Sequence, residues 1–185
     1  MATDSQIKDF VKAALPISKD IQTRYGIPYQ FAIAQSSLES GYGQVAPGNM
    51  YFGMKAPASW KGKTQYLWTT EYVGGKPVKM QQLFKAYDSM AESFEDWAKL
   101  LTGLPRYAPA FQFKDDVMKF AAAIVKAGYA TDINYVQKIQ TVLDYLKKKG
   151  YIEIAAISTG AVLILGMTAA IIRKYVYGKR KVQSR

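Results

Sequence analysis

Residues 34 to 43 read Ala-Gln-Ser-Ser-Leu-Glu-Ser-Gly-Tyr-Gly. The run that leads into them from Pro28 predicts a helix with a buried apolar face, which ends before Gly41 and Gly43. Glu39 then lies on the last turn of this helix. The negative end of the helix dipole and the apolar neighbours both disfavour an ionised carboxylate, so we expect a raised pKa for Glu39. Such a carboxyl group is suited to act as a general acid at neutral pH.

The composition restricts the chemistry that this carboxyl group can join. The chain has no His and no Cys, which excludes Ser-His-Asp and Cys-His triads and zinc sites built on those ligands. Carboxylates, tyrosines and lysines remain for acid–base chemistry. We therefore expect no metal ion and no cofactor.

An uncharged segment lies near the end of the 185-residue chain. From Ile154 to Ile172 it reads Ile-Ala-Ala-Ile-Ser-Thr-Gly-Ala-Val-Leu-Ile-Leu-Gly-Met-Thr-Ala-Ala-Ile-Ile. As a helix it would extend about 28 Å, close to the hydrocarbon thickness of a bilayer. Cationic residues and two tyrosines follow it, as at a membrane interface. The sequence predicts a globular domain over 1–149, a transmembrane helix over 150–177 and a basic tail over 178–185; the alternative is a buried core helix.

The chain carries a net charge of +11, but its cations are spread along the domain and gathered in the tail. The tail suits anionic lipid headgroups. The domain lacks the dense basic face and interleaved aromatic residues that nucleic-acid binding needs. We therefore expect no nucleic-acid partner and favour a basic surface that is attracted to an anionic polymer.

Two helices are expected before the one that carries Glu39. Asp4 is a candidate cap for the first, whose apolar residues recur at helical spacing. Pro16 is expected to open a second helix that ends at Gly26.

The clearest strand signal is a hairpin around Gly74 and Gly75. Its predicted strands are 65–72 and 78–87. Alternation places Tyr66, Trp68, Thr70 and Tyr72 on one face and Leu67, Thr69, Glu71 and Val73 on the other.

Helices return after the hairpin. Ser89 and Glu92 match a capping box for one helix. Two more are expected near 115–127 and 132–148. The whole pattern predicts a mainly α (α+β) domain with a small β-hairpin lobe.

The order of motifs resembles the glucosaminidase domain of glycoside hydrolase family 73, which includes bacterial and phage peptidoglycan hydrolases. The matching stretches follow the family order over roughly residues 5 to 147: AQSSLESGYG (34–43), NMYFGMK (49–55), WKG (60–62), TTEY (69–72), FKAYD (84–88), ESFEDWAKLL (92–101), PRYA (105–108) and AGYATD (127–132), with Tyr135.

This resemblance implies a lysozyme-like fold and cleavage of the β-1,4 bond after N-acetylglucosamine in peptidoglycan glycan strands. It implies that Glu39 is the general acid. Glu71 matches the hairpin Glu that the family places across the cleft, where it would activate water or stabilise developing positive charge. The alternatives for Glu71 are a solvated strand residue, or a nucleophile supplied by the 2-acetamido group of the substrate.

The resemblance also implies supporting residues. Asp96 matches an acidic residue after the hairpin, although a structural hydrogen-bonding role is nearly as well founded. The tyrosines of the last motifs suit sugar stacking and hydrogen bonding, or a place in the core. The supporting residues expected from the motifs are Asp96, Tyr107, Tyr129, Tyr135, Asn49, Phe52 and Gly53.

Two other functions remain compatible with the sequence. Lytic transglycosylases also place a lone Glu before Ser in a lysozyme-like fold, and an inactive wall-binding protein would keep the fold alone. The expected location is a single-pass membrane anchor through Ile154–Ile172, with the catalytic domain facing the cell wall. That membrane belongs either to a cell or to a phage virion.

Overall fold

The computed structural model of the chain describes residues 2–74 and 76–153, and for Glu71, Tyr72 and Val73 the backbone alone. The chain divides into two compact units, Met1–Ile152 and Glu153–Arg185, and the fold described here is that of the first. The predicted membrane span Ile154–Ile172 and the basic tail lie outside the described residues. No helix in the described part is long and apolar enough to cross a bilayer.

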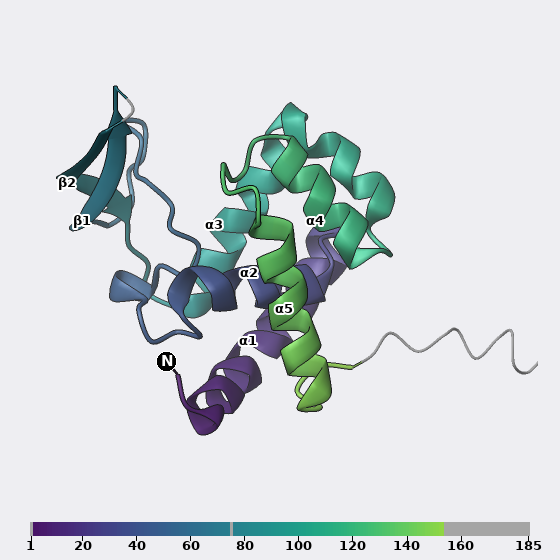
Figure 1. The fold of residues 1–185 in the computed structure, drawn as a ribbon. Helices are drawn as coiled ribbons and strands as arrows, with labels where there is room; N and C mark the ends of the chain where they lie inside the picture. Colours follow the sequence, from purple (N-terminus) through teal and green to yellow (C-terminus); the bar gives the residue numbers. More distant parts are fainter. Residues whose placement is uncertain (1, 75, 154–185) are drawn as a thin grey trace, which may run out of the picture. The chain divides into compact units, whose positions relative to one another are not determined.

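Helices make up most of the first unit, and a single hairpin interrupts them (Figure 1). In chain order the elements are α1 (Asp4–Tyr25), α2 (Tyr29–Ser40), a 3-10 turn η1 (Pro47–Asn49), β1 (Thr64–Val73), β2 (Lys76–Lys85), α3 (Met90–Gly103), a 3-10 segment η2 (Pro105–Phe113), α4 (Val117–Lys126) and α5 (Tyr135–Lys148).

The first helix corrects two expectations. α1 is one helix of 22 residues with Pro16 inside it, and Thr3 caps it through a capping box with Gln6. A proline inside a helix removes one hydrogen bond and crowds the preceding turn. The apolar face outweighs this cost because it continues past the proline, from Ala14 to Ile21, and both of these residues are fully buried.

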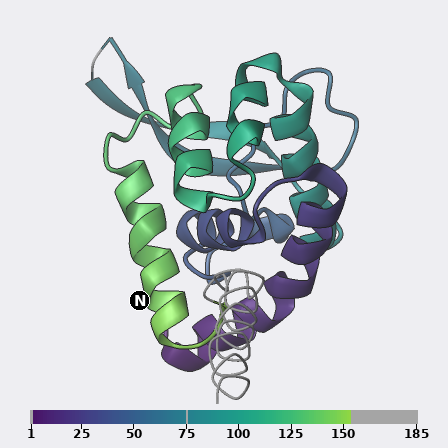
Figure 2. The same cartoon turned by 90° about the vertical axis from the view of Figure 1, so that its right-hand side faces the viewer.

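The helix that carries Glu39 is the centre of the domain. α1, α4 and α5 all contact α2, and Figure 2 shows α2 between α1 and α5. Almost every residue of α2 is buried, including the polar residues Gln35, Ser36 and Ser37. α2 is therefore buried around most of its circumference, and Glu39, near its C-terminal end, is its one exposed residue.

The hairpin forms around Gly74 with the predicted alternation, although its second strand begins and ends two residues earlier than expected, at Lys76 and Lys85. β1 and β2 pair antiparallel, with Trp68 opposite Gln81 and Gln65 opposite Phe84. Tyr66 and Trp68 are 70% and 63% exposed, whereas Leu67 is half-buried. The base of the hairpin is held by a small apolar cluster: Met50, Phe84 and Tyr87, with Trp60 and Leu67 against it.

The elements after the hairpin differ in detail from the expectation. Ser89 caps α3 by accepting a hydrogen bond from the Glu92 N–H, but the Glu92 carboxylate accepts from Asp88 N–H, so the box is not reciprocal. The 3-10 segment η2 was not predicted; prolines at two of its nine positions, 105 and 109, disfavour a regular α-helix there.

Candidate active site

Glu39 is the last but one residue of α2. Gly41 ends the helix in a left-handed conformation with φ of 56°, which favours glycine. The buried helix thus brings a single carboxylate to the surface at its C-terminal end, where the helix dipole disfavours negative charge.

Two groups from distant parts of the chain meet the Glu39 carboxyl group. The hydroxyl of Tyr135, the first residue of α5, donates a hydrogen bond of 2.6 Å to Glu39 Oε1. On the other side, a Cβ added to Gly53 would lie 3.8 Å from Glu39 Oε2. One carboxyl oxygen is therefore held by a phenol, and the other lies next to a residue without a side chain.

The pKa of Glu39 is raised, chiefly because burial removes part of the hydration of its charged form. The residue as a whole is exposed, yet the protein around its carboxyl group is dense enough for this effect to dominate. The Tyr135 hydrogen bond and the positive charge of Lys138 both lower the pKa and offset part of the rise. The direction agrees with the expectation for a general acid.

The three tyrosines expected to support the site lie together in series. The ring of Tyr135 is 6.3 Å from that of Tyr129, which is 6.2 Å from that of Tyr107. Burial raises the pKa of the Tyr129 and Tyr135 hydroxyls, and the charge of Glu39 raises both further. These phenols therefore stay protonated at neutral pH and are available as hydrogen-bond donors.

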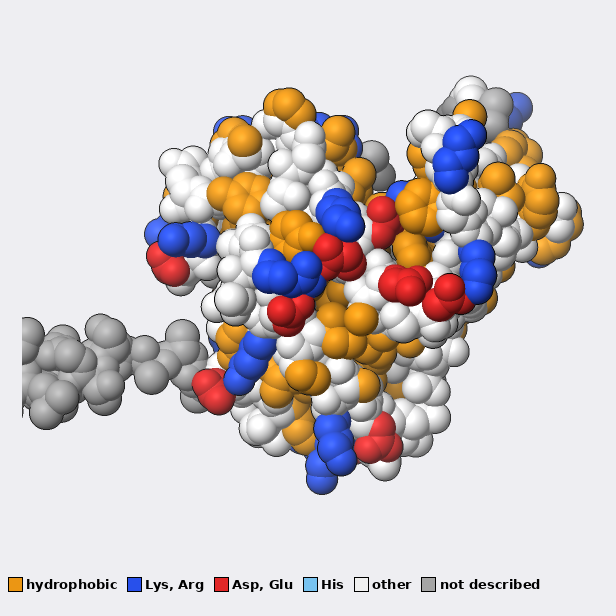
Figure 3. Space-filling model, turned by 180° about the vertical axis from the view of Figure 1, so that it is seen from behind, with side chains coloured by type: hydrophobic (Ala, Val, Ile, Leu, Met, Phe, Trp, Pro, Cys, Tyr) orange, Lys and Arg blue, Asp and Glu red, His pale blue; other side chains and the backbone are white. Residues whose placement is uncertain are grey.

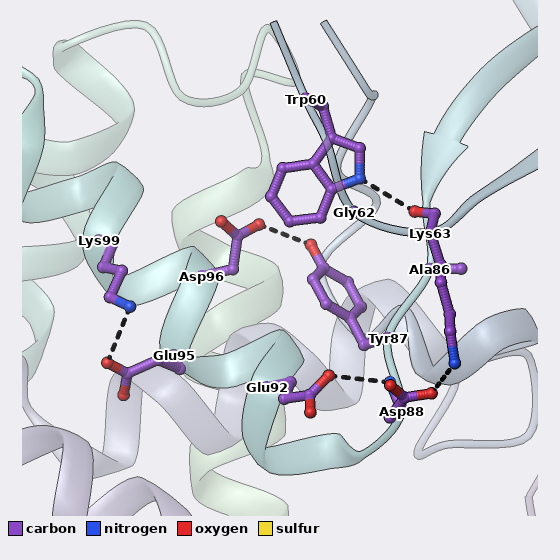
Figure 4. A pocket seen from close by; sticks show the side chains of 10 residues that line it. All are labelled: Trp60, Gly62, Lys63, Ala86, Tyr87, Asp88, Glu92, Glu95, Asp96 and Lys99. Carbon is purple, nitrogen blue, oxygen red and sulfur yellow. Dashed lines mark hydrogen bonds and ion pairs between the residues drawn. The ribbon is translucent and has the colours of Figure 1, made fainter.

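Asp96 lies in a separate group of interactions. Its carboxylate pairs with Lys85 at 2.8 Å and accepts a hydrogen bond of 2.7 Å from the Tyr87 hydroxyl. The three side chains tie α3 to the end of β2, and Figure 4 shows the hydrogen bond between Tyr87 and Asp96. The structure thus gives Asp96 the structural partners that the sequence left open as an alternative.

A pocket of about 510 Å³ adjoins this group. Four carboxylate residues, Asp88, Glu92, Glu95 and Asp96, line it together with Trp60 and Tyr87. Figure 3 shows acidic side chains gathered on this face, below the hairpin. Glu39 is not among the lining residues of this pocket.

Two of the expected supporting residues, Asn49 and Phe52, stabilise the loop that follows α2. Asn49, with φ of 53°, donates a hydrogen bond to the Tyr87 carbonyl and holds the loop to the end of the hairpin. Phe52 is 4% exposed and stacks on Trp97 with ring centroids 4.4 Å apart. Phe52 therefore anchors the loop that presents Gly53 to Glu39.

The position of Glu71 is described for its backbone alone. It pairs with Val78 in the hairpin register. Its role stays a prediction.

The sequence did not predict several residues that bond to the expected site residues around Glu39 and Asp96. Gln35, Lys85 and Tyr87 all bond to expected site residues. Gln35 had a recognisable signal, because a Gln inside an apolar helical run needs a hydrogen-bond partner once it is buried. Within residues 2–74 and 76–153, no three Asp or Glu side chains are arranged to hold a metal ion.

A helical domain with one hairpin, and a lone glutamate with a raised pKa beside tyrosines at a helix end, defines a lysozyme-like glycoside hydrolase. The chain belongs to the glucosaminidase family, described as mannosyl-glycoprotein endo-beta-N-acetylglucosaminidase, whose model matches residues 15–148.

Curated relatives are similar over most of this chain. The peptidoglycan hydrolase FlgJ of Salmonella typhimurium is 38% identical over 148 residues, which cover 76% of this chain and 46% of the relative. FlgJ of Pseudomonas aeruginosa is 32% identical over 158 residues, which cover 82% of this chain and 39% of the relative. The chain thus spans less than half the length of these relatives.

Solved structures share the fold. A C-terminally truncated glycoside hydrolase domain of Salmonella typhimurium FlgJ matches with a TM-score of 0.66 at 37% identity, covering 77% of this chain and 98% of that domain. The catalytic domain of the autolysin Auto from Listeria monocytogenes matches with a TM-score of 0.70 at 28% identity, covering 82% of this chain and 90% of that domain.

Proposed function

We propose that this chain hydrolyses peptidoglycan, cleaving the β-1,4 bond after N-acetylglucosamine with Glu39 as the general acid. The observation that carries the proposal is the Glu39 carboxyl group: its pKa is raised by burial, and one of its oxygens lies beside Gly53. Two curated relatives of this chain are named peptidoglycan hydrolases.

In this mechanism Glu39 protonates the glycosidic oxygen as the bond breaks through an oxocarbenium-like transition state. The other face of the sugar is served either by Glu71 or by the 2-acetamido group of the substrate. Tyr129, next to Tyr135 in the tyrosine series, is proposed to contact the sugar through its ring and hydroxyl.

The test is lysis of purified peptidoglycan by Glu39→Gln. This variant keeps the size of the side chain and removes the acid, so we expect turnover to fall by at least about 100-fold. Asp144→Asn is the control, because its exposed carboxylate bonds to Gln140 on the surface of α5. Wild-type lysis by Glu39→Gln would overturn the assignment.

Analysis of the products separates this function from its competitor. Hydrolysis after N-acetylglucosamine leaves a reducible glucosamine end, whereas a lytic transglycosylase leaves 1,6-anhydro-muramic acid. Variants of Glu71 then separate the two nucleophile mechanisms: Glu71→Gln loses activity if Glu71 acts and retains most of it if the acetamido group acts.

We also propose a single-pass membrane anchor at Ile154–Ile172, with the catalytic domain facing the wall. What supports it is the uncharged stretch followed by cationic residues. Fractionation of cells, or of purified virions for a phage origin, should recover the full chain with membranes. Recovery in the aqueous fraction would contradict the anchor.

A further inference from the structure

Three hydrogen-bonded side chains, Gln35, Tyr135 and Glu39, connect the core of α2 to the proposed acid. Gln35 Nε2 donates to the Tyr135 hydroxyl at 3.0 Å, and this hydroxyl donates to Glu39 Oε1 at 2.6 Å. Gln35 is fully buried and Tyr135 is 6% exposed. Gln35 lies one helical turn before Glu39 on the same helix, so α2 fixes the spacing of these two residues.

The donor at the buried end, Gln35, decides the direction of donation along these hydrogen bonds. An amide nitrogen only donates, so the Tyr135 oxygen accepts from Gln35 and its own proton is left for Glu39. Turning the Gln35 amide round would reverse this, but it would place both buried N–H bonds at the position of Oε1, which has no hydrogen-bond partner. The present orientation leaves one N–H and the Oε1 acceptor unpaired, whereas the turned amide would leave two N–H donors unpaired. A buried unpaired N–H is less well tolerated than a buried unpaired carbonyl oxygen, so the present orientation is favoured.

The consequence concerns the two oxygens of Glu39. Oε1 accepts from Tyr135 whether or not the carboxyl group is protonated, and the carbonyl oxygen of a neutral carboxyl group is a better acceptor than its hydroxyl oxygen. The acid proton is therefore carried by Oε2, which lies beside Gly53.

We propose that Gln35 is a positioning residue that acts through Tyr135 to hold the acid proton of Glu39 on Oε2, facing the open surface at Gly53. The proposal rests on Glu39 being the general acid of the proposed function. It goes further by stating which oxygen gives up its proton, and which buried residue decides this.

The other charged and polar neighbours of Glu39 do not change the direction of these hydrogen bonds. The groups that lower the pKa of Glu39 are Tyr135 and Lys138 on α5, and the charge of Glu39 in turn raises the pKa of Tyr129. Lys138 only donates and is itself paired with Asp132 at 2.6 Å. The described neighbours of Glu39 on α5 therefore offer it donors and no competing acceptor.

The test is an NMR titration of the Glu39 carboxyl carbon in the full chain, in which only five glutamates contribute signals. Glu39→Gln identifies the signal. Gln35→Met keeps the length of the side chain and removes the donor, which frees the Tyr135 hydroxyl to accept from a protonated Glu39. We expect the pKa of Glu39 to rise by about half a unit to one unit, the size of one hydrogen bond.

A double substitution tests whether Gln35 acts through Tyr135. Tyr135→Phe alone should raise the pKa of Glu39, since it removes the donor to Oε1. Gln35→Met should then add nothing in the Tyr135→Phe background. Gln140→Met is the matched control, because Gln140 bonds to Asp144 on the exposed side of α5. An additive shift in the double variant, or no shift from Gln35→Met, would overturn the proposal.

A measurement on the unsubstituted chain covers the case in which Gln35→Met fails to fold. The Gln35 side-chain amide should stay hydrogen-bonded, with slow exchange, on both sides of the Glu39 titration. Loss of that protection when Glu39 becomes protonated would show that the hydrogen bonds reverse their direction of donation, and would refute the proposal. These titrations need no turnover, so they succeed or fail separately from the lysis test of Glu39→Gln.

Discussion

At the scale of a single residue, Glu39 is placed at a cost to the folded state. Its folded pKa is raised by burial, so protonation favours folding and ionisation disfavours it. The penalty is absent below the unfolded pKa of about 4.5, where both states are protonated. It develops as the pH rises through the folded pKa and persists at neutral pH.

Glu39→Gln should therefore stabilise the domain at neutral pH while it removes activity. A Gln side chain still accepts from Tyr135 and carries no charge to desolvate. Thermal unfolding at pH 7 should give a higher Tm for the variant than for the wild type, and the difference should shrink towards zero near pH 3. A lower Tm at pH 7 would show that the carboxylate is stabilising.

Gly53 supplies a second prediction at the residue scale. Gly53→Ala would add a methyl group 3.8 Å from Glu39 Oε2 and would strain a backbone with φ of 61°. Gly150→Ala is the control, because its φ is 68° and a Cβ there would meet nothing within 4 Å. Both variants should lose about 1 to 2 kcal/mol of stability.

Activity should separate the two glycine variants. Gly53→Ala is expected to lower kcat/KM by about 10-fold or more, since misplacing the reacting groups is costly, whereas Gly150→Ala should keep wild-type turnover. Equal activities, measured on solubilised glycan at a temperature where both are folded, would show that Oε2 does not face the substrate.

At the scale of elements, a partly exposed group of hydrogen bonds joins α1 to α3. Glu95 on α3 accepts hydrogen bonds from Tyr25 and Arg24 at the end of α1. Arg24 is the largest cause of the lowered pKa of Glu95, which falls to about 2. This contribution to stability is present above pH 4.5 and is lost as the pH falls through about 2.

Glu95→Gln should thus destabilise the domain by about 1 kcal/mol or less at pH 7, since the Arg24 side chain is 45% exposed and solvent screens the pair. The difference from wild type should shrink as the pH falls below 4.5 and should be smallest at pH 2. Asp88→Asn, which breaks an ion pair between two exposed side chains, should cost less. Urea unfolding at pH 7, 4 and 2 checks both; a pH-independent loss would show that packing, not charge, is responsible.

The elements also show how far the sequence predicts this structure. Pro28 and Gly41 marked the start and the end of the helix that carries Glu39, and alternation located the exposed face of the hairpin because the opposite face of that segment is partly buried. Pro16 misled, since a local signal for a helix start was outweighed by a buried face that continues on both sides of it. Local propensity cannot register such long-range packing.

The residues of the candidate site also separate into those that the sequence predicts and those that depend on the fold. The motifs indicated Glu39, Gly53 and the three tyrosines, which the structure brings together. They did not indicate Gln35 or the Lys85–Asp96 pair, because hydrogen bonds between residues 100 and 11 positions apart depend on the fold. The distinction between Phe52, which packs in the core, and Gly53, which adjoins the carboxyl group, likewise needed the three-dimensional arrangement.

At the scale of the whole molecule, the end of the first unit is fastened to its beginning. Asp4, in the first turn of α1, accepts hydrogen bonds from Tyr145 at 2.7 Å and Tyr151 at 3.0 Å. Ile152 is 4% exposed and belongs to the main core. The residues just after α5 are therefore part of the catalytic domain and are not a linker.

Two truncations test this arrangement. A chain that ends after Ile152 should keep the Tm of the folded domain and its specific activity on purified peptidoglycan, because every described contact of the site lies before that residue. A chain that ends after Lys149 also loses the buried Ile152 side chain, and with it about 2 kcal/mol. It should unfold at a lower temperature, although Glu39 and Tyr135 are unchanged.

If both truncated chains unfold with the full-length Tm, residues 150–152 do not contribute to the core. If the chain ending at Ile152 folds but fails to lyse peptidoglycan, the remaining 33 residues take part in catalysis and are not only an anchor.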